Sequence, residues 1–419
     1  MAATLEALPS LAVCKILSFL SWSDKLWMSE NVTEWHEHLC SVEAWPTLQY
    51  EETACTNKQQ ILACLSIYGR YINHITFCFK KQSNMHMERV LQAVGKYCCN
   101  LKIVRIHNLH FCMDSLSDLF AQMLVRCSKL DDVQLFYPET YLCSRGNVVN
   151  ILAAQAASKI TALILHNGSF DGHDGVLHIL QNFKCLRKLR IRRQELSFEV
   201  LLGLAKCNLQ NLSLFKDEEC LLGEPLVYTS EMWQQILALK PDFKTNLILS
   251  NIVVLKTMFP ALAPLQAIIF VDLSATLTKG KIDLIAEYYN STLEIFVYTH
   301  SNTYQSAQMT DRRLPKSLPH LVNACKKLKS LVYGYEISST TILLLGNQRR
   351  MKHLVIAADE LSYEMDSVED WSPSFINWLQ QNGSDMKSLE LEISNLFQYK
   401  WRLANNNEMK EAVEYYSML

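Results

Sequence analysis

The chain has 419 residues, of which 49% are hydrophobic, and its formal net charge is -2 at pH 7. So small a charge gives no general attraction to nucleic acid or to an anionic membrane, and any charge-driven recognition must be local. The length exceeds what one hydrophobic core usually supports, so the sequence predicts either several domains or a repeated unit.

The first segment, residues 5–35, is apolar enough to raise the question of a secretory signal. Glu6 precedes the apolar run, Lys15 interrupts it, and Trp22 stands where a small-residue cleavage site should lie, so a signal peptide is excluded. The longest uncharged apolar stretch, residues 257–271, contains two prolines and is shorter than the roughly 20 residues of a membrane helix. Fourteen cysteines without a disulfide spacing predict reduced thiols. We therefore expect a cytoplasmic or nuclear protein without a membrane partner.

The same segment begins with Leu8-Pro9 and continues with large apolar residues at helical spacing. These further positions are Ile16, Leu17, Leu20, Leu26 and Val32. They are too many for a small helical piece to hide internally. Several of them must therefore pack against the next part of the chain or against a partner protein.

One pattern then recurs along the chain: an apolar residue, two unspecified residues, and two further apolar residues separated by one position. Its copies begin at Ile72, Leu101, Leu130, Ile160, Leu186, Leu209, Leu265, Leu293, Leu328, Met351 and Met386, with a weaker copy at Lys244. The last two apolar positions of each copy alternate, as a short strand with one buried face requires.

The segments between the copies have the spacing of amphipathic helices, and Ser197 and Ser372-Pro373 are expected helix starts. Five cysteines, Cys99, Cys127, Cys185, Cys207 and Cys325, fall just before copies of the pattern, and we interpret them as buried at helix ends. A strand and a helix in each unit of about 20 to 35 residues predict an α/β solenoid. Its parallel strands would line the concave side and its helices the outside.

This pattern resembles the leucine-rich-repeat family over about three-quarters of the chain. The order of residues in the first 47 positions resembles the F-box, a three-helix module, and an F-box directly before leucine-rich repeats is the architecture of ubiquitin-ligase substrate receptors. The resemblance implies an F-box at 1–47 and about twelve degenerate repeats at 48–395. A C-terminal part, 396–419, would then cap the solenoid or fold back across its concave face. Of these two alternatives the cap is slightly favoured.

By the same resemblance, the F-box would dock onto a Skp-type adaptor and through it onto a cullin. The implied adaptor contacts are Leu8, Pro9, Ile16, Leu17, Leu20, Leu26 and Val32. Trp35 and Trp45 would hold the helices together. The alternative is that residues 1–47 only cap the solenoid, which would make the chain a non-catalytic scaffold that assembles partners without a ubiquitin ligase.

Residues that alternate with the buried strand positions should face the concave side. In the first half these are basic, namely Arg105, His107, His166, Lys188, Arg190 and Arg192. In the second half they are apolar, namely Ile248, Ile269, Val271, Val297, Val332 and Val355. The basic half is either a solvated charged face or a binding surface for an acidic or phosphorylated target protein. The apolar half needs a cover, either from the target or from the chain itself.

Other kinds of site are poorly supported by the sequence. Nucleic acid is disfavoured because no stacking aromatic residues interleave with the basic positions. His107, His110 and Cys112 are metal-ligand types, but no second cluster completes a tetrahedral set. No phosphate-binding loop or nucleophile motif occurs, so we expect no metal, no cofactor and no enzyme activity. Three long segments, 215–230, 299–317 and 357–372, are further candidates for contacts.

Overall fold

A computed structural model describes most of the chain. The described residues are 8–53, 58–79, 84–107, 114–136, 146–166, 180, 182–193, 196–216, 228–250, 262–271, 277–300, 314–363 and 371–417. They form two compact units, Met1–Gln210 and Asn211–Leu419. No helix within these described ranges is long and apolar enough to cross a membrane.

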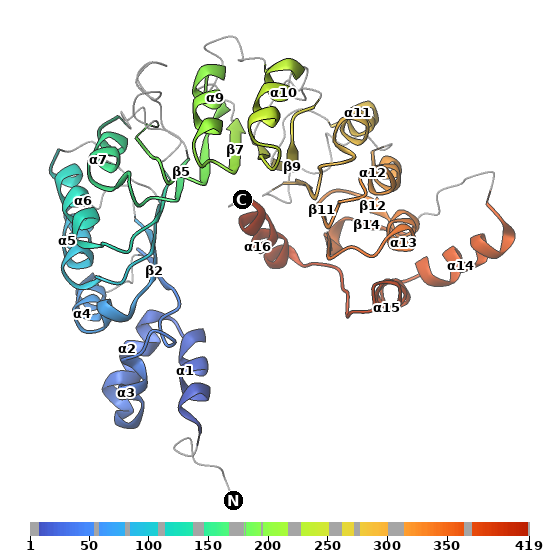
Figure 1. Ribbon diagram of the computed structural model, residues 1–419. Helices are drawn as coiled ribbons and strands as arrows, with labels where there is room; N and C mark the ends of the chain where they lie inside the picture. Colours follow the sequence, from blue (N-terminus) through green and yellow to red (C-terminus); the bar gives the residue numbers. More distant parts are fainter. Residues whose placement is uncertain are drawn as a thin grey trace, which may run out of the picture. The chain divides into compact units, whose positions relative to one another are not determined.

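Unit 1 begins with a small helical module (Figure 1). Its elements are α1 (Ser10–Phe19), α2 (Trp22–Asn31), the 3-10 turn η2 (Thr33–Trp35) and α3 (His36–Leu39). The Ser21 hydroxyl accepts a hydrogen bond from the backbone N–H of Asp24 and so starts α2. Helices α1 and α2 both contact α3, and α2 also contacts the first strand and the first helix of the repeats. The three-helix module predicted for residues 1–47 is therefore packed against the rest of unit 1.

The remainder of unit 1 alternates strands with helices. Six parallel strands lie side by side in chain order: β1 (Leu48–Glu51), β2 (His74–Cys78), β3 (Ile103–His107), β4 (Asp132–Phe136), β5 (Ala162–His166) and β6 (Lys188–Arg192). The helical elements are α4 (Lys58–Tyr68), η3 (Gly69–Tyr71), α5 (Asn84–Tyr97), α6 (Asp114–Arg126), α7 (Gly146–Ala156) and α9 (Phe198–Lys206). Helices α4 to α7 cover one face of this sheet (Figure 1).

Unit 2 repeats this arrangement. Its parallel strands, in spatial order, are β7 (Asn211–Lys216), β8 (Lys244–Ser250), β9 (Leu265–Val271), β10 (Ile295–Thr299), β11 (Ser330–Tyr333) and β13 (His353–Ile356). The helical elements between the strands are α10 (Ser230–Leu239), α11 (Lys279–Tyr289), η6 (Pro315–Ser317), α12 (Leu318–Ala324), α13 (Ser339–Gln348) and η7 (Ala358–Glu360). A second small sheet pairs β12 (Ile337–Ser338) with β14 (Leu361–Ser362), and the chain ends with α14 (Pro373–Gly383), α15 (Met386–Phe397) and α16 (Asn406–Ser417).

Each unit thus has the α/β leucine-rich-repeat architecture, which confirms the predicted fold class. Eleven of the twelve predicted copies coincide with β2 to β11 and β13, and their last two apolar residues are buried, as Ile75 and Phe77 are in β2. The predicted helix starts are also confirmed. The hydroxyls of Ser197 and Ser372 accept backbone hydrogen bonds at the first turns of α9 and α14.

Three expectations from the sequence differ from the structure. The copy at Met386 is not a strand but the start of α15, which the Asp385 carboxylate caps. Strand β1 was not predicted. Cys127 and Cys325, which stand three residues before the start of a copy, are buried as expected. Cys99 and Cys207, which stand two residues before, are exposed, and Cys185 is half-buried.

Candidate docking surfaces

Helix α1 is apolar on two opposite sides. Val13, Cys14 and Leu17 are buried within the module. The other side is exposed to solvent, with relative exposures of 37% for Leu8, 78% for Leu11, 39% for Ile16 and 77% for Phe19. Together with the exposed Pro9 at the helix start, these residues form what we call the α1 stripe: Leu8, Pro9, Leu11, Ile16 and Phe19. Lys15 is exposed on the same side of α1, and its Nζ lies 4.8 Å from the centre of the Phe19 ring. Several exposed apolar residues on one side of a helix are typical of a protein-docking surface.

The α1 stripe contains three of the seven residues that sequence reasoning assigned to adaptor contacts. Leu8, Pro9 and Ile16 are exposed, while Leu20 and Val32 are half-buried. The assignments of Leu17 and Leu26 are wrong for this structure. These two residues are 0% and 6% exposed because they lie on the faces of α1 and α2 that pack inside the unit.

The stripe also includes two residues that sequence reasoning missed, Leu11 and Phe19, and the exposed Trp27 lies on α2. Their position could have been found from the helical spacing, since residues 8, 11, 16 and 19 fall on one side of a helix with 3.6 residues per turn.

The module is fixed to the first repeat by aromatic contacts. The Trp45 ring stacks on Tyr68 of α4 at a centroid distance of 5.2 Å, and its Nε1 donates a hydrogen bond to the Leu39 carbonyl at 2.8 Å. Lys25 Nζ lies 4.8 Å from the centre of the Trp45 ring, and burial lowers the pKa of Lys25 to about 8. Trp35 is also buried, as expected for a residue that holds the helices together. The α1 stripe is therefore presented by a rigid support.

The sheet face of unit 1 that points away from the helices is polar at its centre. Thr76, Arg105 and Gln134 are neighbours on adjacent strands in the pairing register. Arg105 Nε donates to Gln134 Oε1 at 2.7 Å, and Gln134 Nε2 donates to Asp132 Oδ1 at 3.1 Å. Burial lowers the pKa of Arg105 and raises that of Asp132, while the Gln134 hydrogen bond acts against the latter shift. This network pairs Arg105, Gln134 and Asp132 laterally, within the sheet itself, whereas the buried Thr76 hydroxyl has no hydrogen-bond partner among the described residues.

Two histidines on this face are uncharged at neutral pH. His107 stacks on Phe136 with a centroid distance of 4.3 Å and an interplanar angle of 7°. Burial, with a smaller contribution from Arg105, lowers the pKa of His107 to about 4, and the same causes lower that of His74 to about 4. The two residues therefore do not add positive charge to the face at pH 7.

The predicted basic surface for a target protein is only partly present. Lys188 is exposed and Arg105 is half-buried, but Arg190 and Arg192 are 3% and 7% exposed. Burial lowers the pKa of Arg190 to about 10. Their assignment to an open basic surface is wrong, because strand alternation predicts which side of the sheet a residue is on and not whether that side is covered. His166 lies in β5, and its side chain is outside the described residues.

The corresponding face of unit 2 is apolar, as predicted. One residue from each strand contributes to a continuous row across the sheet, and the pairing register places successive members next to each other. This apolar row consists of Phe215, Ile248, Ile269, Val297, Val332 and Val355. Ile248, Ile269, Val297 and Val332 are at most 4% exposed.

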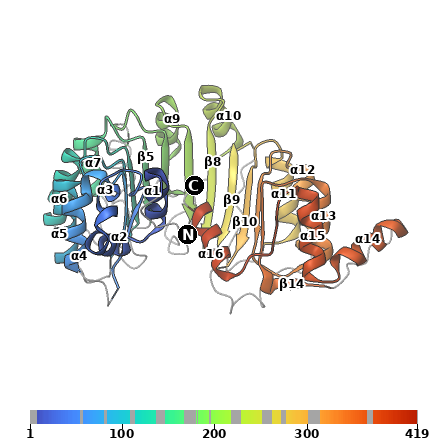
Figure 2. The ribbon, with the colours of Figure 1, turned by 90° about the horizontal axis from the view of Figure 1, so that it is seen from below.

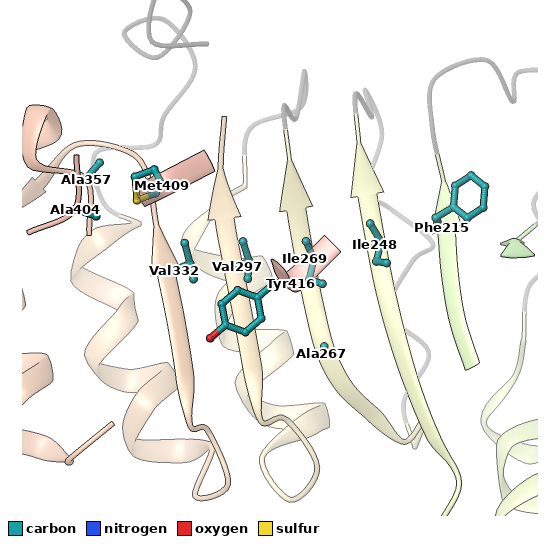
Figure 3. Packing of buried hydrophobic residues seen from close by; sticks show 10 residues of the cluster. All are labelled: Phe215, Ile248, Ala267, Ile269, Val297, Val332, Ala357, Ala404, Met409 and Tyr416. Carbon is teal, nitrogen blue, oxygen red and sulfur yellow. The ribbon is translucent and has the colours of Figure 1, made fainter. Parts of the chain in front are cut away.

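Helix α16 lies against this row. It contacts β9, β10 and β13 on the side of the sheet opposite α11 to α13 (Figures 1 and 2). Met409 and Tyr416 are buried and Ala412 is packed against the same cluster. Figure 3 shows Met409 near Val332 and the Tyr416 ring over Val297 and Ile269. The chain therefore covers its own apolar row, which is one of the two covers that the sequence left open.

The segment before α16 closes the free edge of the sheet. Ala404 N–H donates to the Ile356 carbonyl and Ala358 N–H to the Ala404 carbonyl, both at 2.9 Å. Trp401 Nε1 donates to the Leu354 carbonyl at 2.8 Å. These bonds occupy backbone groups of an edge strand that would otherwise be open to another chain. The C-terminal part thus does both things that were posed as alternatives: residues 399–404 close the edge and α16 folds back over the face.

Other candidates lie largely outside the described residues. This applies to His110 and Cys112, and to 217–227, 301–313 and 364–370 within the three long segments. Across the described ranges, no group of three or more His, Cys, Asp or Glu side chains could hold a metal ion.

Comparisons with known proteins give only distant likenesses. No protein-family model matches the chain, and no curated protein matches it in sequence. It is similar to the crystal structure of the Rad7 and Elc1 complex in yeast, with a TM-score of 0.47 and 13% identity over 87% of this chain and 91% of that chain. It is also similar to the crystal structure of the leucine-rich-repeat-containing protein LegL7 from Legionella pneumophila. The TM-score is 0.39 and the sequence identity is 12%, over 81% of this chain and 100% of that chain.

The crystal structure of the TLR13-ssRNA13 complex gives a TM-score of 0.32 and 15% identity, over 74% of this chain and 45% of that chain. None of these likenesses determines the function of this chain. The functional argument rests on its own docking surfaces.

Proposed function

We propose that this chain is the substrate-recognition subunit of a Skp-cullin-F-box ubiquitin ligase. The observation that carries the proposal is the α1 stripe. It exposes Leu8, Pro9 and Ile16, which the F-box resemblance assigns to the adaptor, on a helix whose opposite side is fixed in a packed three-helix module. An apolar stripe on so rigid a support is suited to bind a groove in a partner protein.

The proposed mechanism is positional and needs no catalytic residue in this chain. The module binds the adaptor and through it the cullin, while the repeats hold a target protein in the cytoplasm or nucleus. Holding the target near the ubiquitin-charged enzyme raises the effective concentration of the reacting groups. Among the predicted basic residues whose side chains the structure describes, the exposed Lys188 and the half-buried Arg105 are the cations accessible to an acidic or phosphorylated target.

Co-expression with a Skp-type adaptor tests the proposal. The informative variant is Ile16→Asp combined with Phe19→Asp, because both side chains are exposed and the substitutions leave the buried face of α1 unchanged. The matched control is Val125→Asp, which changes a 58% exposed apolar residue on α6. Size-exclusion chromatography then reports whether the chain and the adaptor elute together.

We expect the native chain and the Val125→Asp control to form a stoichiometric complex, and the double variant to lose it with an unchanged thermal unfolding curve. A native chain that folds but ignores the adaptor would contradict the proposal. The first module would then be a cap on the repeats, and the chain would act as a scaffold without a ubiquitin ligase.

A further inference from the structure

Helix α16 does not complete a repeat. The edge of the unit 2 sheet is already closed by residues 399–404, and the outer helix layer already ends in α14 and α15, both of which contact α13. Helix α16 instead lies on the opposite face, where the repeats contain no other helix among the described residues of unit 2. Helix α16 is therefore additional to the repeats, whose sheet edge and outer helix layer are complete without it.

The contact is made by one narrow side of α16. Met409 and Tyr416 are buried and Ala412 and Val413 are half-buried, which are positions i, i+3, i+4 and i+7 of an amphipathic helix. Lys410, Glu411, Glu414 and Tyr415 are exposed. This is the way an amphipathic helical peptide lies in a hydrophobic groove of a receptor.

The sheet is shaped for such a helix. A helix of 12 residues is about 18 Å long, and strands are about 4.8 Å apart, so α16 spans about four neighbouring strands. Gly334, directly after β11, lies beside Met409: a Cβ atom there would meet Thr299 Oγ1 first and Met409 Cε at 3.2 Å.

The start of helix α16 is held by hydrogen bonds within residues 405–408. The Asn405 side-chain oxygen accepts from the N–H groups of Asn407 and Glu408 at 3.0 Å each, and Glu408 Oε2 accepts from the Asn405 N–H at 3.0 Å. This reciprocal pair is a capping box, which helps a helix form independently of its packing. These cap hydrogen bonds do not involve the apolar row, whereas the bond from Asn406 Nδ2 to Asp359 Oδ2 at 3.1 Å would break if the helix left it.

We propose that the apolar row is a receptor surface for an amphipathic helix of a target protein, and that α16 occupies it as an internal competitor. The target helix carries a large apolar residue, a small one three positions later and an aromatic residue seven positions after the first, as Met409, Ala412 and Tyr416 do. This goes beyond the proposed function, since the row accepts such a helix whether or not the α1 stripe binds an adaptor.

A peptide-binding assay without any adaptor tests this inference. The probe is a fluorescent synthetic peptide of residues 402–419, and the receptor is the full chain with Met409→Asp and Tyr416→Asp, which releases its own α16. The native chain and a Tyr415→Asp chain, changed at an exposed neighbouring tyrosine, are the controls. A peptide with the same two substitutions at 409 and 416 controls for nonspecific binding.

The double-variant chain should bind the native peptide, and the two control chains should bind it roughly tenfold or more weakly. In the control chains α16 covers the apolar row most of the time, and the apparent affinity is reduced by the fraction of molecules in which the row is open. The substituted peptide should bind none of them. A folded double variant that ignores the native peptide would overturn the inference. Equal binding by the native chain and the double variant would overturn it too.

If the double variant does not unfold cooperatively, Ala412→Glu replaces it in the binding assay. Hydrogen exchange of the native chain is a second, independent test of the inference. The inference requires the amides of α16 to exchange faster than those of β9 to β11, through local opening. Exchange of α16 only together with the strands would mean that the helix is part of the core, and the inference would fail.

Discussion

The two units build their sheets from the same repeat but differ in the chemistry of the face that points away from the helices. In unit 1 the central positions of β3 and β4 are Arg105 and Gln134, which bond to each other within the sheet. In unit 2 the equivalent positions of β10 and β11 are Val297 and Val332, which α16 covers. The side chains at alternate strand positions therefore decide whether a face pairs polar groups within the sheet or presents apolar atoms that need a cover.

The largest expected effect comes from removing the edge closure of unit 2. Trp401→Ala should lower the free energy of unfolding by about 3 to 5 kcal/mol, because a buried indole and its hydrogen bond to the Leu354 carbonyl are both lost. Urea unfolding followed by circular dichroism measures this change. Leu239→Ala, at a half-exposed position on α10, is the control and should change little. A loss below about 1 kcal/mol would show that the edge needs no closure.

A smaller effect should follow from weakening the cover alone. Tyr416→Ala should lower the free energy of unfolding by about 1 to 3 kcal/mol and increase the binding of a hydrophobic dye, because it uncovers the apolar row. Tyr415→Ala, at a 66% exposed position, should do neither. If both variants behave alike, the row is not covered by α16 in the way described.

The polar face of unit 1 should make stability depend on pH. His74 and His107 have pKa values of about 4 when folded and of about 6.5 when unfolded, so the unfolded chain binds more protons between these values. Stability is therefore complete above pH 6.5 and falls as the pH decreases toward 4. Replacing both residues by Gln should flatten this dependence, by on the order of 1 to 2 kcal/mol at pH 4.5 once the two shifts are discounted for solvent screening of these half-buried rings. Thermal unfolding at several pH values provides the measurement, and an unchanged slope would contradict the assignment.

The smallest expected effect concerns the lateral network on the same face. Gln134→Leu should cost about 0.5 to 1.5 kcal/mol, because Arg105 and Asp132 each lose a hydrogen-bond partner. Gln49→Leu, at an exposed position on β1, is the matched control. Chemical denaturation of the two variants separates them. An unchanged free energy of unfolding for Gln134→Leu would mean that water satisfies Arg105 and Asp132 as well as Gln134 does.

Most of the fold could be read from the sequence because the repeat couples two periods, alternation in the strands and helical spacing between them. The pattern failed at Met386, where Leu389 and Leu391 alternate as in a strand. In the structure Leu389 is buried but Leu391 is 65% exposed, because Leu389, Ile393 and Phe397 instead form the buried side of a helix. Strand β1 follows the same pattern, as Trp45, Leu48 and Tyr50, which are all at most 1% exposed. It was missed because Trp45 was assigned to the helical module at 1–47.

The candidate surfaces were less predictable than the fold. The apolar row was foreseen because alternation alone defines it. The burial of Arg190, Arg192 and Leu17 was not, since burial depends on what packs against a residue from elsewhere in the chain. The same reasoning missed Leu11 and Phe19, which helical spacing places on the α1 stripe once the boundaries of α1 are known.

The central claim is that one side of α1 holds the first module together while the other binds a partner. Hydrogen exchange of the native chain, alone and with a Skp-type adaptor, tests it most directly. The account predicts slower exchange in residues 8–31 on adding the adaptor and no change in β9 to β11. Protection confined to the repeats, or no protection anywhere, would contradict it.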